Sequence, residues 1–181
     1  MGSRAPTGAL SPCPWETWNK VALTTAQSAR YARHIVLKDM GGAGQQRLSA
    51  AHIAIVGAGG LGAPVIAYLA GAGIGKLTII DPDTISLSNL ARQVIYSDAD
   101  LDSPKANAAA RFAARLNPEI TPMAKVESLT PDNAKKLLSG ADLVVEGTDS
   151  FAAKRAVAAA CADPEIPLVT GALGPFDGSV T

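Results

Sequence analysis

The sequence predicts an α/β fold of the Rossmann type, with a mostly parallel sheet and helices on both faces. Short runs of β-branched, apolar residues alternate along the chain with segments that carry helix-capping residues and helix breakers. A glycine-rich turn follows the first of these runs and leads directly into an apolar helix. Asp81 ends the second run about 20 residues further on, the place of the acidic residue in dinucleotide-binding folds.

Capping residues and breakers place the helices. Helices are predicted to begin at Thr24, Ser103 and Thr130 and to end at 41–46, Asn117–Pro118 and Gly140. The first helix is expected to run unbroken through SARYARHIVL until GGAGQQ ends it, and Ser103 is expected to be an N-cap with Pro104 as the first helical residue. Further helices are predicted at 45–49, after the glycine-rich turn, and at 151–161.

Apolar runs place the strands at 53–56, 76–81, 120–126, 142–146 and 167–172. Pro122 cannot donate a hydrogen bond to a neighbouring strand, so its strand is expected at an edge of the sheet or at a bulge. The final residues, GPFDGSVT, predict a tight turn into one more strand.

The composition is typical of one globular domain. The chain has 181 residues, of which 48% are hydrophobic and 18% are charged. Sixteen basic residues balance sixteen acidic ones, so the net charge favours neither nucleic acid nor a membrane surface as a partner. The N-terminus has no apolar segment of a signal peptide. We expect a cytoplasmic protein with a flexible tail at 1–23 and one domain at 24–181.

The uncharged stretch from Ile53 to Gly75 has the length of a membrane span. Its glycines argue against that interpretation, because each one weakens the interior of a helix. They are Gly57, Gly59, Gly60 and Gly62. A strand, a glycine turn and a helix explain the stretch better than a single membrane helix does.

Three of these glycines fit the pattern GxGxxG, in which backbone N–H groups approach a phosphate at the start of a helix. The pattern alone does not separate NAD from ATP, and a turn without a ligand is the alternative. The next segment, 81–93, is polar where an NAD-binding domain would proceed to its next helix. Its polar groups suit a ribose and a triphosphate, although a solvated loop is the alternative. They belong to Asp81, Asp83, Asn89, Arg92 and Gln93.

Two further residues are candidates for a phosphate site. Lys105 lies in the first turn of a predicted helix, where the helix dipole disfavours a cation by roughly a few tenths of a kcal/mol. Either an anion shares its site or the side chain extends to solvent. Asp149 follows a buried strand and would hold Mg²⁺ on a polyphosphate, or else cap the next helix. His34 and Cys161 lie on predicted helices and are interpreted as packing residues.

Several segments together resemble the ThiF/MoeB/HesA family, the bacterial relatives of ubiquitin-activating enzymes. They are RYARHIVL, GQQRL, IVGAGGLGAP, AGIGKLTIIDPDTISLSNLARQ, SPK, EGTDSF and PLVTGALGPFDGSV, and they cover about residues 26–181. Members of this family use MgATP to adenylate the C-terminal glycine of a ubiquitin-like sulfur carrier that ends in Gly-Gly, and they release pyrophosphate. The product serves molybdopterin or thiamine-thiazole synthesis. The family usually forms homodimers.

The resemblance implies roles for individual residues. It assigns Gly60 and its loop to ATP, Asp81 to the ribose and Asp149 to Mg²⁺, and it assigns Arg33 to the site of the partner subunit. It assigns the phosphates to Asn89, Arg92, Gln93 and Lys105. Asp83, Ser88 and Ser150 complete the implied nucleotide site, with Ser150 standing where many members have Asn. The implied catalytic residues are Arg33, Arg92, Lys105 and Asp149.

The chain also departs from this family. Members continue beyond the position of Thr181, and many carry two C-x-x-C zinc pairs there. This chain offers only Cys13 and Cys161, so we expect no zinc, although a longer form would bind it. The chain could be a fragment of a longer protein, a natural truncation or an inactive relative of the family, and the sequence leaves these three interpretations open. The alternative functions are an NAD(P)-binding oxidoreductase and a truncated, non-catalytic nucleotide-binding module.

Overall fold

The computed structural model describes residues 22–162 and 165–181, so almost all of the expected tail at 1–23 lies outside it. Within these residues a six-stranded sheet has the order β3-β2-β1-β4-β5-β6. The strands are β1 (His52–Val56), β2 (Lys76–Ile80), β3 (Thr121–Lys125), β4 (Leu143–Glu146), β5 (Leu168–Leu173) and β6 (Gly178–Val180). All neighbours are parallel except β5 and β6. The predicted fold class is confirmed, and so is the edge position of the strand that contains Pro122.

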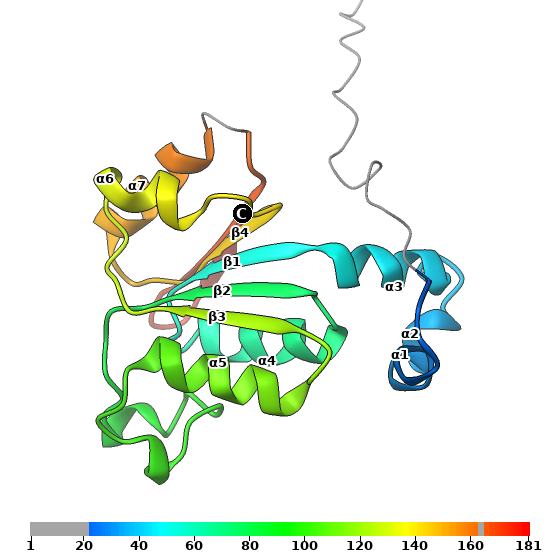
Figure 1. The fold of residues 1–181 in the computed structure, drawn as a ribbon. Helices are drawn as coiled ribbons and strands as arrows, with labels where there is room; N and C mark the ends of the chain where they lie inside the picture. The colour runs from blue at the N-terminus through cyan, green and yellow to red at the C-terminus, as the bar shows by residue number, and fades with distance from the viewer. Residues whose placement is uncertain (1–21, 163–164) are drawn as a thin grey trace, which may run out of the picture.

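Helices cover both faces of this sheet (Figure 1). On one face lie α4 (Gly62–Ala72) and α5 (Lys105–Leu116), and on the other lie α6 (Pro131–Leu137) and α7 (Phe151–Ala162). Successive residues of a strand point to opposite faces. In β1, Ile53 and Ile55 therefore pack with α4 and α5, whereas Ala54 and Val56 pack with α6 and α7. Burial on both faces explains why β1 is apolar after its first residue.

The uncharged stretch that resembled a membrane span is divided between β1 and α4. In the described part of the chain no helix has both the length and the apolar character that a membrane crossing requires. Gly73 ends α4 in the left-handed conformation, with φ of 83°. Cys161 of α7 is buried in the core beneath α6 and α7, as expected for a packing residue.

The N-terminal helices differ from the prediction. The expected capping box of Thr24 and Gln27 starts α1 (Thr25–Arg30). The helix does not continue, because Tyr31 interrupts it before α2 (Ala32–Ile35). Tyr31 is only 3% exposed, and its hydroxyl accepts a hydrogen bond of 2.8 Å from Asn117 Nδ2. The unbroken helix was therefore a wrong prediction, and contact with the core is the reason for the break.

The prediction that GGAGQQ breaks a helix is also wrong. These residues belong to α3 (Gly41–Ala50), which begins where a break was expected and includes the short helix predicted at 45–49. A Cβ atom at Gly44 would lie 2.5 Å from the sulfur of Met40. The absence of a side chain at this position lets Met40 pack against the helix.

The start of α5 is shifted by one residue from the prediction. Pro104, not Ser103, is the N-cap, and Lys105 is the first helical residue. The Ile85 N–H donates to the Ser103 carbonyl at 3.0 Å, and the Lys105 N–H donates to the Asp83 carbonyl at 2.8 Å. The chain stays extended through Pro104 because it pairs with the segment after β2. The predicted end of this helix at Asn117 and the start of α6 after Thr130 are confirmed.

Substituting Gly73 tests the packing between α4 and Tyr31. A Cβ at Gly73 would lie 2.5 Å from ring atoms of Tyr31. We expect Gly73→Ala to lower the free energy of unfolding by about 1–2 kcal/mol through its backbone conformation, and by a further 1–3 kcal/mol through crowding. Gly71→Ala is the matched control, because a Cβ there meets no atom within 4 Å, and it should raise stability slightly. Equal effects of the two variants in urea unfolding would contradict this account.

Candidate nucleotide site

The carboxyl ends of β1 and β4 meet where the strand order of the sheet changes direction. β1 has β2 on one side and β4 on the other, all parallel. Open α/β sheets bind ligands beyond the strand ends at such a point. The loops that follow the two strands touch, since a Cβ at Gly57 would lie 3.2 Å from the Gly147 carbonyl and from Thr148 Cγ2. Gly57 has φ of 93°, so the backbone and the space both require glycine there.

The backbone of the glycine loop, 57–62, is held on several sides. The Ala58 N–H donates to Asp81 Oδ2 at 2.7 Å, and the Ala58 carbonyl accepts from the Tyr96 hydroxyl at 2.8 Å. The Gly59 carbonyl accepts from the Ala63 N–H at 2.9 Å. In the described part of the chain, the N–H groups of Gly59 and Gly60 have no acceptor. Unpaired N–H groups at the start of a helix are suited to a phosphate.

Asp81 joins this loop to the polar segment that follows β2. The residue is 5% exposed, and its carboxylate accepts backbone N–H groups of Ala58, at 2.7 Å, and of Asp83, at 2.8 Å. Burial raises the pKa of Asp81, and these two hydrogen bonds partly oppose that change. The expected ribose-binding carboxylate thus lies at the base of the glycine loop.

The polar segment lies against the open side of the loop. A Cβ at Gly60 would be 3.7 Å from Arg92 Nε, and a Cβ at Gly59 would be 3.8 Å from Gln93 Nε2. Gln93 is 2% exposed, and its Oε1 atom has no hydrogen-bond partner in the described residues. The structure therefore brings two of the expected phosphate-binding side chains to the loop.

Two other expected residues shape the turn that carries Arg92. The Ser88 carbonyl accepts a hydrogen bond from Arg92 Nη1 at 3.1 Å. Asn89 Oδ1 accepts from the Ser86 N–H at 3.1 Å and so caps the short helix η2 (Leu87–Asn89). Ser88 and Asn89 thus order the segment around Arg92.

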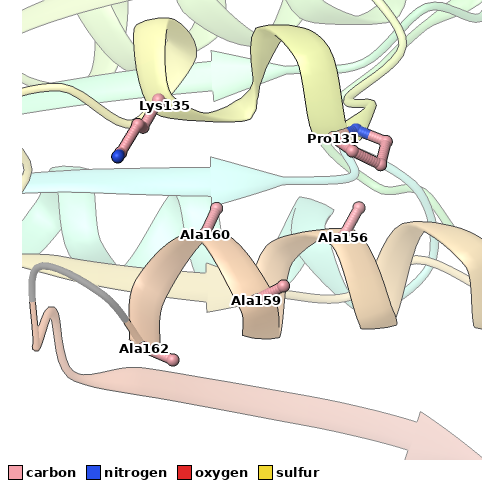
Figure 2. A pocket seen from close by; sticks show the side chains of 6 residues that line it. All are labelled: Pro131, Lys135, Ala156, Ala159, Ala160 and Ala162. Atoms are coloured by element: carbon pink, nitrogen blue, oxygen red, sulfur yellow. The ribbon is translucent and has the colours of Figure 1, made fainter.

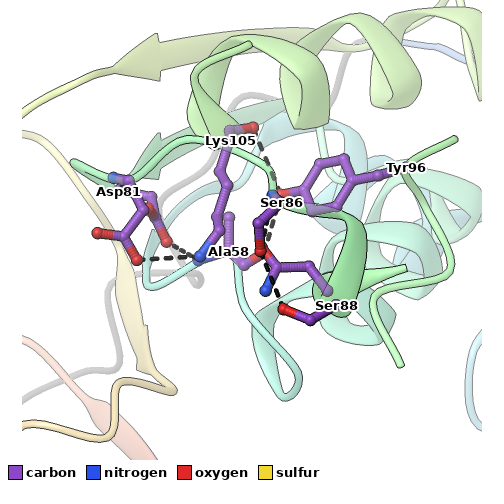
Figure 3. Close-up of polar contacts among 8 residues, drawn as sticks. Ala58, Asp81, Ser86, Ser88, Tyr96 and Lys105 are labelled. Carbon is purple, nitrogen blue, oxygen red and sulfur yellow. Dashed lines mark hydrogen bonds and ion pairs between the residues drawn. The ribbon is translucent and has the colours of Figure 1, made fainter. Parts of the chain in front are cut away.

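Lys105 has a buried side chain, 8% exposed, and forms an ion pair with Asp83 at 2.9 Å. The alternative of a lysine that extends to solvent is wrong, because the N-terminus of α5 lies under the segment after β2. Figure 3 shows Lys105, Tyr96 and Ala58 close together beside Asp81. A positive charge therefore stands next to the glycine loop.

Asp149 and Ser150 lie exposed in the loop between β4 and α7. Ser150 Oγ accepts a 3.4 Å hydrogen bond from the Ala153 N–H, so Ser150 and not Asp149 caps α7. Asp149 makes no hydrogen bond or ion pair with the described residues. Mg²⁺ in nucleotide sites uses one or two carboxylates together with phosphates and water, and Asp149 fits that mode. The described residues contain no group of three acidic, His or Cys side chains that would bind a metal alone.

Arg33 lies far from the glycine loop of its own chain. It is exposed on α2, beyond the amino ends of the strands, whereas the loop lies at the carboxyl ends (Figure 1). The five residues of β1 alone span about 16 Å. Tyr31 separates α2, which carries Arg33, from α1, which ends at Arg30. The structure does not place Arg33 in the site of this chain.

A buried ion pair beside the site, between Glu146 and Lys154, was not predicted from the sequence. Glu146 is 1% exposed and accepts from Lys154 Nζ and from Thr170 Oγ1, each at 2.6 Å, and from the Thr148 N–H at 2.7 Å. Burial alone would raise the pKa of Glu146, but its hydrogen bonds, first of all from Lys154, hold the pKa below the ordinary value. The sequence signal that could have indicated this pair is an acidic residue at the end of a buried strand. The pair ties β4, β5 and α7 together next to Asp149.

A hollow of about 630 Å³ lies between α6 and α7 (Figure 2), and no residue of the glycine loop lines it. It is lined by Pro131, Lys135, Ala156, Ala159, Ala160 and Ala162. Five of these six side chains are apolar, so the hollow lacks the convergent polar groups of a nucleotide site.

Comparison with known proteins identifies the family. The sequence model of the ThiF family matches residues 31–181. The chain belongs to the ThiF family. It is 40% identical over 161 residues to the SAMP-activating enzyme E1 of Haloferax volcanii, with 89% of this chain and 60% of that protein covered. It is 40% identical over 159 residues to the molybdopterin-synthase adenylyltransferase of Salmonella typhimurium, with 88% and 64% covered.

A solved structure of this fold contains ATP. The ThiF-family chain matches the E. coli tRNA N6-threonylcarbamoyladenosine dehydratase TcdA in complex with ATP, with a TM-score of 0.81 and 32% identity over 87% of this chain and 65% of that one. It is also 39% identical to the sulfur carrier protein ThiS adenylyltransferase of E. coli, over 83% of this chain and 60% of that protein. The chain thus spans less than two thirds of the length of these relatives.

The buried pair of Glu146 and Lys154 predicts a pH dependence of stability. Because the folded-state pKa of Glu146 lies below 4.5, its ionised form stabilises the fold above that pH, and this contribution is lost as the pH falls through the folded-state pKa. Glu146→Gln should lower stability by about 3 kcal/mol near neutral pH. The difference in the free energy of unfolding between this variant and the parent should become smaller at acidic pH.

Urea unfolding at about pH 7 and about pH 3.5 measures both differences. Glu127→Gln is the control, because Glu127 is exposed and makes no hydrogen bond or ion pair with the described residues. A Glu146→Gln deficit of the same size at both pH values would contradict the assignment.

Proposed function

We propose that this chain is an adenylyltransferase, or the nucleotide-binding part of one, that uses MgATP to activate the C-terminal glycine of a ubiquitin-like sulfur-carrier protein. The observation that carries the proposal is the position of Arg92 and Gln93 against the unpaired N–H groups of the glycine loop. Membership of the ThiF family supports it, and so do relatives named as adenylyltransferases of sulfur carriers.

The reaction needs no protein nucleophile. A carboxylate oxygen of the carrier's terminal glycine attacks the α-phosphorus of ATP, the bond from that phosphorus to the oxygen of the β-phosphate breaks, and pyrophosphate leaves. Catalysis then depends on positioning and on stabilising negative charge. The loop N–H groups, Arg92 and Lys105 would supply positive potential, and Asp81 would hold the ribose. Lys105 would exchange part of its contact with Asp83 for a phosphate.

Mg²⁺ would neutralise phosphate charge and orient the leaving pyrophosphate. Asp149 would hold it, because its carboxylate is exposed in the loop after β4 and has no partner in the described residues.

The alternative of an NAD(P)-dependent oxidoreductase rests on the glycine pattern alone. Arg92 lies in a polar turn that is ordered by the hydrogen bond from the Ser86 N–H to Asn89 Oδ1. This turn suits a more highly charged ligand than a dinucleotide. A non-catalytic nucleotide-binding module shares every contact described above, so only an assay of the reaction separates it from the proposed enzyme.

Exchange of labelled pyrophosphate into ATP tests the proposed function. We expect exchange that requires Mg²⁺ and an added carrier ending in Gly-Gly, because adenylation is reversible only when the carboxylate acceptor is present. A carrier whose last glycine is replaced by alanine is the matched control. ATP binding without exchange would support the non-catalytic module, and NADH binding in place of ATP would support the oxidoreductase.

Complementation tests a role for Arg33 in the site of a partner subunit. We propose that the enzyme is a homodimer in which Arg33 stabilises transition-state charge in the opposite site, as arginine fingers do. Arg33→Ala should abolish exchange but keep ATP binding, and Asp149→Ala should be inactive as well. A random equimolar mixture should recover about one quarter of the parent activity, because each heterodimer keeps one intact site.

Arg30→Ala is the control for Arg33, since Arg30 lies on the neighbouring helix and, among the described residues, donates only to the Leu116 carbonyl, at 3.4 Å. It should keep exchange activity. Heterodimers that form without recovering activity would count against a role of Arg33 in the opposite site.

A further inference from the structure

Tyr96 connects the glycine loop to the start of α5. Its side chain is buried, 7% exposed, and its hydroxyl donates to the Ala58 carbonyl at 2.8 Å. The Lys105 carbonyl lies 3.4 Å from the same hydroxyl (Figure 3). A phenol has a single proton, so the shorter contact is the effective hydrogen bond. Burial raises the pKa of Tyr96, which keeps the hydroxyl protonated and able to donate.

This hydrogen bond determines which way the next N–H group points. In a trans peptide the C=O and the N–H point in opposite directions. Because the Ala58 carbonyl points to Tyr96, the Gly59 N–H of the same peptide points away from Tyr96 and out of the core. The preceding peptide is held in the same way, through the Ala58 N–H on Asp81.

The following peptide obeys the same rule. The Gly59 carbonyl accepts from the Ala63 N–H of α4, so the Gly60 N–H points away from that helix. Two consecutive N–H groups are therefore available where Arg92 and Gln93 lie. Consecutive N–H groups of this kind form an anion-binding concavity.

Gly59 allows the Ala58–Gly59 peptide to rotate easily. A residue without Cβ adopts many backbone conformations at similar energy, so the loop itself does little to prevent this peptide from rotating. A partner for the Ala58 carbonyl is thus needed to keep the Gly59 N–H in place.

We propose that the Tyr96 hydroxyl is a positioning group for nucleotide phosphate: it holds the Ala58 carbonyl and thereby aims the Gly59 N–H at a phosphate oxygen. Tyr96 itself does not touch the nucleotide. The proposal rests on the proposed function only in that a nucleotide phosphate binds at this loop. It adds a residue outside the set that the resemblance to the family implied.

Tyr96→Phe removes the hydroxyl and keeps the ring. We expect its affinity for ATP, measured by calorimetry, to fall by about 3- to 10-fold, the effect of one hydrogen bond. Its affinity for adenosine, which has no phosphate, should stay within error of the parent. Tyr68→Phe is the matched control, because Tyr68 is 78% exposed on α4 and its hydroxyl has no partner in the described residues, and it should change neither affinity.

The Gly59 amide provides a second readout that does not depend on activity. In protein labelled with ¹⁵N-glycine, ATP and inorganic triphosphate should each shift the Gly59 amide resonance of the parent and protect it from hydrogen exchange. In Tyr96→Phe the shift and the protection should be much smaller. A purely structural role for Tyr96 would lower the melting temperature without this selective loss.

The outcomes separate this proposal from the proposed function. Unchanged ATP affinity in Tyr96→Phe, or equal losses for ATP and adenosine, would overturn the role of Tyr96. A parent protein that binds neither ATP nor triphosphate would overturn it as well. Selective loss of ATP affinity in a protein that shows no pyrophosphate exchange would support the role of Tyr96 and count against the proposed enzyme alone.

Discussion

Asp81 directly follows β2, and the two oxygens of its buried carboxylate accept backbone N–H groups from the glycine loop and from the polar segment. These segments come from different strand ends, and each carries part of the candidate site. Asp81 therefore fixes the start of the segment that carries Arg92 and Gln93 relative to the glycine loop. A carboxylate that must stay ionised while buried needs such donors, because burial favours its neutral form. The hydrogen bonds of Asp81 thus both hold the strand ends together and form the base of the candidate site.

The close approach of α4 to the loop is a second requirement. A Cβ at Gly62 would lie 1.8 Å from the Gly57 carbonyl oxygen, so the helix can begin there only with glycine. The short distance places the helix N-terminus directly beneath the loop, where its dipole favours an anion. The glycine spacing, recognised in the sequence as a phosphate-binding pattern, has this packing as its physical cause.

Local signals predicted much of the fold, whereas contacts between distant residues account for the errors. The strands around β1 and the capped starts of α1 and α6 follow from nearby residues, and all were predicted. The break at Tyr31 depends on Asn117, 86 residues later, and the burial of Lys105 depends on Asp83, 22 residues earlier. Glu146 received no role because its partners Lys154 and Thr170 lie on other elements. Asp81 lies at the glycine loop because the carboxyl ends of neighbouring parallel strands share one edge of the sheet, and the segment after it brings Arg92 and Gln93 to the loop.

The two edges of the sheet differ in their capacity to accept another strand. At one edge, β3 contains Pro122, which lacks the N–H that a new neighbour would need there. At the other edge, β6 is antiparallel to β5 and contains only Gly178, Ser179 and Val180, with neither proline nor charge. Natural proteins protect open sheet edges with proline and charged residues. Of the two edge strands, β6 is therefore the one whose backbone could pair with a further strand.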